Sequence, residues 1–276
     1  MQRTIVIGNI SLDHIHRPGH PPLHQLGGAA LHLAAAAARA GLHAAPASAV
    51  GDDLSGLRGD PRLPRLDWSL LHHAPEPSAA FTIHYDTTET VTAVDTDYGA
   101  ARHLTAHALH VIDAHSRMIF HVCCRHPLDA ATVLEQLTRR GCAFSLDFHL
   151  PSAPQLIPAA APWLHHATTI FVNAQEHALL SHHTGRPRPC PETVITDGPR
   201  PARVLTHHFP PQPVTPAATP TVRQITGAGD TLAGTYLAHR ARHLPPAAAL
   251  DLAVQAATRH TARSPLTLPA PRRAPS

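Results

Sequence analysis

Short runs of apolar and β-branched residues, each followed by a helix-forming stretch, constrain the fold of this chain more than any other feature. Strands are expected at 4–7, 46–50, 118–123, 143–147, 169–172 and 193–196. Helices are expected at 29–40, 128–140, about 229–240 and 246 to about 263. Apolar strands that alternate with helices are typical of a parallel sheet covered on both faces. The sequence therefore predicts an α/β protein with a mainly parallel central sheet.

One segment departs from this alternation. Residues 81–86 and 90–95 alternate polar and apolar side chains around Thr87-Thr88-Glu89, which is typical of an antiparallel hairpin. A hairpin inside a βα chain indicates an inserted lid. Its aromatic residues, Phe81 and Tyr85, either cover a ligand or pack between the lid strands.

Composition narrows the class of protein. The 276 residues suffice for one large domain or two small ones, and 43% are hydrophobic but only 4% aromatic, so alanine and leucine must fill the core. The net charge is +3 and the arginines are scattered, whereas a nucleic-acid-binding protein usually carries a basic patch. We therefore expect no nucleic-acid partner. No apolar run approaches a membrane span and no signal peptide is evident, so we expect a cytoplasmic protein without a membrane partner.

Histidines and cysteines raise the question of a metal site. Many of the 26 histidines are adjacent pairs, and neighbours on a strand or helix point in different directions. The four cysteines form no CxxC pair and no HExxH occurs. We expect surface histidines and reduced thiols.

The loop Thr226-Gly227-Ala228-Gly229-Asp230 carries the strongest chemical signal. Its small residues let the backbone approach a ligand, and amides at the start of a helix attract anions. A carboxylate directly after such an anion hole is suited to take a proton from a nucleophile that attacks a phosphate. The alternative is a glycine-rich helix cap with an acidic first turn.

Other segments add to this signal in order along the chain. Residues 8–13 connect the first strand to Asp13. The carboxylate of Asp13 either accepts hydrogen bonds from substrate hydroxyls or forms an Asx turn. Gly27-Gly28 opens the helix that contains His32. Asn173 and Glu176 lie at i and i+3, on one face of a helix, a spacing that also suits a helix capping box. Thr196-Asp197-Gly198 follows a strand.

Together these segments resemble the pfkB family of carbohydrate and nucleoside kinases, from Ile5 to about Arg263. The resemblance implies a ribokinase-like three-layer sandwich with a small β lid. It implies one domain over residues 1–276, with the lid formed by about 11–25 and 79–104 and a flexible tail at 265–276. Ser145 to His149 resembles a further family segment, with His149 in place of asparagine.

The resemblance also implies the role of each site residue. The catalytic set would be Asp230 as base, with Gly227, Ala228 and Gly229 as anion hole. The substrate set would be Asn9, Asp13, Gly27, Gly28 and His32. The nucleotide set would be Thr196, Gly198, Thr226 and Gly229, and the metal pair Asn173 and Glu176. ATP and Mg²⁺ are the implied donor and ion, a monovalent cation is a further candidate, and the lid is a candidate homodimer interface.

Two functions of different class remain open. One is an ATP-dependent kinase that phosphorylates a hydroxyl group of a sugar, nucleoside or related polyol. The other is a catalytically impaired homologue with a ligand-binding or regulatory role. Departures from the family pattern motivate the second, namely His32, Pro201, Gln224 and Ile225. A dinucleotide-binding oxidoreductase would need GxGxxG after the first strand, and a P-loop kinase would need a lysine, which this chain lacks.

Overall fold

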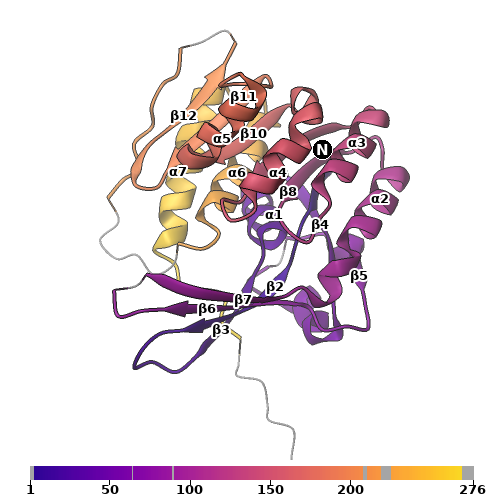
Figure 1. Ribbon diagram of the computed structural model, residues 1–276, viewed down its shortest axis with the longest axis vertical. Coiled ribbons are helices and arrows are strands. Elements are labelled where there is room, and N and C mark those ends of the chain that lie inside the picture. Colours follow the sequence, from indigo (N-terminus) through magenta and orange to yellow (C-terminus); the bar gives the residue numbers. More distant parts are fainter. Residues whose placement is uncertain (1–2, 64, 89, 208–209, 219–224, 269–276) are drawn as a thin grey trace, which may run out of the picture.

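An eight-stranded sheet forms the centre of the molecule, in the order β12-β11-β10-β9-β8-β1-β4-β5 (Figure 1). The computed structural model describes the chain except for residues 1–2, 64, 89, 208–209, 219–224 and 269–276. Neighbouring strands are parallel except for β11 and β12. The central strands are β1 (Arg3–Ile7), β4 (His43–Val50), β5 (Leu71–His73), β8 (Ile119–Cys124), β9 (Ala143–Phe148), β10 (Thr169–Asn173), β11 (Glu192–Asp197) and β12 (Arg200–Thr206).

Helices cover both faces of this sheet and create two apolar cores. The helices are α1 (Ala29–Arg39), α2 (Leu104–Ala114), α3 (Ala130–Arg139), α4 (Ala153–Ala160), α5 (Ala174–Thr184), α6 (Ala228–Arg240) and α7 (Pro246–Thr261). One core joins the sheet to α1, α6 and α7, and the other joins it to α2, α3, α4 and α5. This is the three-layer α/β sandwich that the sequence predicts.

Alanine allows the first of these cores to pack closely. Every residue of α1 from Ala29 to Ala38 is buried, and a carbon added at Gly234 of α6 would lie 2.2 Å from the carbonyl oxygen of Leu33. The two helices can therefore approach until their backbones nearly touch. Because α6 starts with the glycine-rich loop, this packing fixes the loop relative to the sheet.

A second sheet forms the lid, in the order β3-β2-β6-β7. Its strands are β2 (Ser11–His16), β3 (Leu23–Gly27), β6 (Ala79–Tyr85) and β7 (Val91–Asp97). Because β2 begins soon after β1 ends, the lid lies at the carboxyl edge of the central sheet (Figure 1). In open α/β sheets this edge is where ligands bind.

The lid differs from the sequence prediction in two respects. Its second segment ends at Asp97, since residues 99–103 form a 3₁₀ helix and Leu104 begins α2. The alternation in β7 does not mark a buried face, because all of its residues are exposed at the free edge of the lid. Phe81 packs edge-to-face on Tyr98, and Arg17 lies over the ring of Tyr85.

The start of the predicted tail is ordered. Leu26 donates from its amide to the carbonyl of Leu266, and Leu268 donates to the carbonyl of His24, so this segment adds to the edge of β3. The expectation of a flexible tail is therefore wrong for residues 265–268, and residues 269–276 lie outside the described part. Among the described helices, none is long and apolar enough to cross a membrane.

Candidate active site

One end of the site lies at the lid, around Asp13 of β2. The side chain of Asp13 is buried, accepts a hydrogen bond from the Ser11 hydroxyl at 2.8 Å and lies against Gly27, where an added carbon would be 2.1 Å from a carboxylate oxygen. Gly28 precedes α1, as the sequence predicts. Burial raises the pKa of Asp13 to about 6. Gln25 also hydrogen-bonds to the Asp13 carboxylate, whose two oxygens still have lone pairs for a further donor such as a ligand hydroxyl.

Asn9 and His32 complete this end. The Asn9 amide donates to the carbonyl of His126 at 3.0 Å, and its side-chain oxygen has no partner within the described part of the chain. His32 is 7% exposed, and its Nε2 atom likewise has no partner there. Burial, aided by His260 and Arg125, lowers the pKa of His32 to about 3, so the ring is neutral. Buried polar atoms without partners are rare, and these two indicate a ligand site.

The glycine-rich loop lies beside His32 and leads into α6. Gly227 has φ of +81°, and an added carbon there would be 2.6 Å from the His32 ring. The Thr226 carbonyl accepts from His260 at 2.8 Å. The Ala228 amide donates to the carbonyl of Ile225 at 3.2 Å. The turn before α6 therefore uses the amide of Ala228, one of the three donors predicted for the anion hole.

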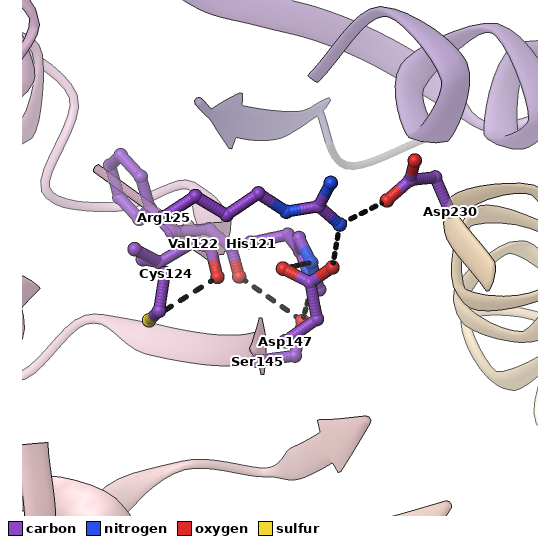
Figure 2. Close-up of polar contacts among 8 residues, drawn as sticks. His121, Val122, Cys124, Arg125, Ser145, Asp147 and Asp230 are labelled. Atoms are coloured by element: carbon purple, nitrogen blue, oxygen red, sulfur yellow. Dashed lines mark hydrogen bonds and ion pairs between the residues drawn. The ribbon is translucent and has the colours of Figure 1, made fainter. Parts of the chain in front are cut away.

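Asp230 lies in the first turn of α6 and forms an ion pair that the sequence did not indicate. The Arg125 Nη2 atom is 2.6 Å from Asp230 Oδ1 and 2.8 Å from Asp147 Oδ2 (Figure 2). Both carboxylates are buried, whereas the Arg125 side chain is 24% exposed. Burial raises the pKa of Asp230, and the Arg125 guanidinium opposes that rise. The same guanidinium, together with His121, holds the pKa of Asp147 below its usual range against the effect of burial.

Sequence reasoning missed Arg125 for an identifiable reason. Arg125 directly follows β8, so its position at the carboxyl edge was readable from the predicted strand at 118–123. Its two carboxylate partners are 22 and 105 residues away along the chain, and only the order of the strands and the packing of α6 bring them together. Asp147 belongs to β9, which pairs with β8 so that Asp147 lies opposite Cys123.

His121, Cys123 and Asp147 form a buried cluster whose potential ligand atoms lie within 4.8 Å of one another. His121 Nε2 faces Asp147 Oδ1 at 3.6 Å, and His121 Nδ1 is 2.9 Å from the Ser145 hydroxyl (Figure 2). The guanidinium on the other oxygen of Asp147 disfavours a second cation nearby. We therefore assign no metal to this cluster.

The predicted metal pair forms a helix cap. Asn173 accepts from the amides of Gln175 and Glu176 at 2.9 Å, and Glu176 accepts from the Asn173 amide at 2.8 Å. This is the capping-box alternative that the spacing left open. Burial raises the pKa of Glu176 to about 7, and the charges of Asp147 and Arg125 also act on it. Asp147, Glu176 and Asp230 are thus three carboxyl groups whose ionisation is affected by one guanidinium, that of Arg125.

A cavity of about 790 Å³ opens on the other side of the loop. Its lining includes Thr196, Gly198, Ile225, Ala228 and Gly229, so it gathers most of the predicted nucleotide residues. Leu232, Val254 and Ala257 give it an apolar wall. The volume lies within the usual range for small-molecule sites. Gln224 lies outside the described residues.

Asp13 in the lid and Asp230 on α6 thus both lie at the carboxyl edge of the central sheet, with the glycine-rich loop leading into α6. The sequence matches the family of pfkB carbohydrate kinases over residues 6–272, and the chain belongs to that family. No curated protein matches it by sequence.

Solved structures share the fold at low sequence identity. A nucleoside kinase from Burkholderia thailandensis in complex with inosine is 21% identical, covers 94% of this chain and 91% of its own, and has a TM-score of 0.82. The nucleoside kinase of Methanocaldococcus jannaschii is 17% identical over 96% and 93%, with a TM-score of 0.79. A putative ribokinase II from E. coli, in complex with ATP and Mg²⁺, is 18% identical over 96% and 94%, with a TM-score of 0.78.

Proposed function

We propose that this chain is an ATP-dependent kinase that transfers the γ-phosphoryl group to a hydroxyl group of a sugar, nucleoside or related polyol. The observation that carries the proposal is the position of Asp230, which is buried at the start of α6 between the acceptor residues and the apolar cavity. Family membership supports the reaction type. The B. thailandensis and E. coli structures, with inosine and with ATP and Mg²⁺, support the classes of acceptor and donor.

Each residue has a chemical task in this reaction. Asp13 and Asn9 accept hydrogen bonds from acceptor hydroxyls, and neutral His32 adds an uncharged ring nitrogen. Asp230 takes the proton of the reacting hydroxyl while the oxygen of that hydroxyl forms a bond to the γ-phosphorus. The bond from that phosphorus to the bridging oxygen breaks, and its electron pair stays on ADP. The first amides of α6, at Gly229 and Asp230, face the developing negative charge.

Mg²⁺ bound with ATP would balance the phosphate charge, and Glu176, with Asn173, is the candidate to hold it. Glu176 is buried close enough to Asp147 and Arg125 for their charges to affect its pKa. The apolar cavity beyond Gly229 would take the nucleoside part of ATP. Its alanine, valine and leucine side chains suit the face of a planar base.

One observation favours the second candidate function, a catalytically impaired binding protein. One carboxylate oxygen of Asp230 already forms an ion pair with Arg125, so one of the two acceptor atoms of Asp230 is occupied. If catalysis needs both oxygens free, the chain would bind ligands without turnover.

Measuring ADP release separates these functions. The purified protein is assayed with ATP and Mg²⁺ over a panel of sugars, nucleosides and polyols, beside Asp230→Asn and the control Asp251→Asn on the exposed side of α7. We expect Asp230→Asn to lower kcat by about 10²–10⁴-fold, the usual contribution of a general base, and Asp251→Asn to leave it unchanged. Ligand binding without turnover by the native protein would favour the binding function.

A further inference from the structure

The feature that the proposed reaction does not yet explain is Arg125. Its Nη2 atom donates to two buried carboxylates, at 2.6 Å to Asp230 and 2.8 Å to Asp147. The Nε atom of Arg125 is buried and has no partner within the described residues. The Arg125 side chain is only 24% exposed, and a buried, unpartnered donor in it, beside the candidate base, is costly unless it has a task.

The backbone around Arg125 is fixed from two directions. The carbonyl of Arg125 accepts from the Leu128 amide at 3.0 Å, and the next carbonyl, of His126, accepts from Asn9 at 3.0 Å. Asn9 follows β1, which pairs with β8. The turn after β8 is thus tied to the end of β1, and this directs Arg125 across the carboxyl edge of the sheet.

Asp147 anchors the guanidinium at Nη2, the same nitrogen that contacts Asp230. It lies in β9 next to β8, with one oxygen on Arg125 and the other facing His121. Figure 2 shows the resulting series, from His121 through Asp147 and Arg125 to Asp230. Arg125 is therefore held in place by a carboxylate that does not itself reach the acceptor residues.

Asp230 is left with one oxygen for chemistry. Its Oδ1 atom lies on Arg125, whereas Oδ2 accepts no hydrogen bond from the described residues and points away from the guanidinium in Figure 2. A carboxylate held at one oxygen cannot rotate freely, and it keeps a lone pair for a hydroxyl proton at the other. An unheld carboxylate in this buried position would lose both its orientation and its charge.

The charged groups around Asp230 also indicate a role for Arg125. The groups that act on Asp230 are Arg125, Asp147 and His121, and His32, His149 and Glu176 also feel the charge of Arg125. Burial lowers the pKa of His149 to about 4, so at neutral pH it is uncharged, as is His32. Arg125 is the one permanent cation among these groups.

We propose that Arg125 is a positioning residue for phosphoryl transfer: anchored on Asp147, it holds Oδ1 of Asp230 so that the ionised Oδ2 faces the acceptor hydroxyl. This role rests on the proposed kinase function, and it adds a residue to which the family resemblance gave no part. On this view the ion pair serves catalysis and does not block it.

The test compares Arg125→Gln, which removes the charge, with Arg125→Lys, which keeps it. The matched control is Arg140→Gln. Arg140, at the end of α3, forms an ion pair of 2.6 Å with Asp113 of α2, and the two side chains are 46% and 45% exposed. Rates of ADP release are measured against pH. We expect Arg125→Gln to lower kcat at least tenfold at pH 7, with little change in acceptor KM.

The pH profile separates positioning from a merely structural role. Without the guanidinium the pKa of Asp230 rises, so the acid limb of kcat should move up by one unit or more, and activity should recover partly at high pH or with added guanidinium ion. Arg125→Lys should keep the acid limb of the kcat profile at the same pH as in the native protein. Arg140→Gln should have the same profile as the native protein. An unmoved acid limb, or a rise in kcat in Arg125→Gln, would overturn the proposal.

A second measurement does not depend on turnover. In Arg125→Gln, burial alone raises the folded-state pKa of Asp230 above its unfolded value, so stability is full at low pH and is lost as pH rises through that raised value. We expect this loss in unfolding experiments and expect Asp230→Asn in the same background to reduce it, since Asp147 also loses the guanidinium and keeps its own share of the loss. If the native protein turns over no acceptor, the kinase function fails, and this result still decides whether Arg125 keeps Asp230 ionised.

Discussion

Gly227 and His32 are in contact at the floor of the site, and each restricts the other. Gly227 has a left-handed φ of +81°, and a carbon added to it would lie 2.6 Å from the His32 ring. We expect Gly227→Ala to lower the free energy of unfolding by about 1–3 kcal/mol, because it combines backbone strain with a clash. Urea unfolding measures this loss.

Two further variants separate the causes. His32→Ala in the Gly227→Ala background should restore only part of the stability, since it removes the clash but not the strain. Gly56→Ala, where an added carbon meets nothing within 4 Å, should be close to neutral. A Gly227→Ala protein as stable as the native one would contradict the described contact.

We expect Asp13 to lower the free energy of unfolding at neutral pH, although the same carboxylate contributes to acceptor binding. Its folded-state pKa is raised from 3.8 to about 6 by burial, so its full contribution to stability holds below about pH 4 and is lost as pH rises through 6. At pH 8 the loss corresponds to at most about 3 kcal/mol. Asp13→Asn should therefore be more stable than the native protein at pH 8, with a smaller gain at pH 4.

Unfolding at the two pH values, together with acceptor KM, checks this trade-off. We expect Asp13→Asn to weaken acceptor binding at least tenfold while its stability at pH 8 rises. A stability difference that is the same at both pH values would show that Asp13 is not buried as described.

At the scale of the elements, α7 and the start of α6 form the wall of the apolar cavity. Ala257 lines that cavity, whereas the adjacent Ala256 does not. We expect Ala257→Phe to raise the KM for ATP at least tenfold, because the ring would fill part of the cavity, with little change in acceptor KM. Ala256→Phe is the matched control and should leave the KM for ATP unchanged. Equal effects of the two substitutions would contradict a nucleotide site here.

Most central elements could be predicted from sequence because their apolar runs are local signals. The strands at 118–123 and 169–172 were predicted to within one residue at each end, and β1 likewise. β12 and β5 were not predicted. β12 alternates exposed and buried residues around Pro201, and β5 has only three residues, so neither contains a continuous apolar run.

The candidate site was predictable only where its residues lie in one motif. The loop at 226–230 and the pair Asn173 and Glu176 are local patterns, although the structure shows that the pair also caps α5. Arg125 has no local motif. Its partners are determined by the strand order β10-β9-β8-β1 and by the packing of α6 on α1, and neither can be derived from spacing along the chain.

On the scale of the whole molecule, the site lies where three parts of the chain meet. The lid contributes Asp13, the carboxyl edge of the sheet contributes Asn9, Arg125 and Asp147, and α6 contributes Asp230. The lid and α6 are joined through α1, which starts at Gly28 directly after β3 and packs along α6. A displacement of α1 would therefore change the distance between Asp13 and Asp230.

The most direct test of the central claim is to identify the product. The native protein and Asp230→Asn are incubated with ATP, Mg²⁺ and each acceptor of the panel, and the products are analysed by ³¹P NMR and mass spectrometry. We expect the native protein to form ADP and one phosphate monoester of an acceptor hydroxyl in equal amounts, and Asp230→Asn to form about 10²–10⁴-fold less. The same product at an undiminished rate from Asp230→Asn would contradict the account.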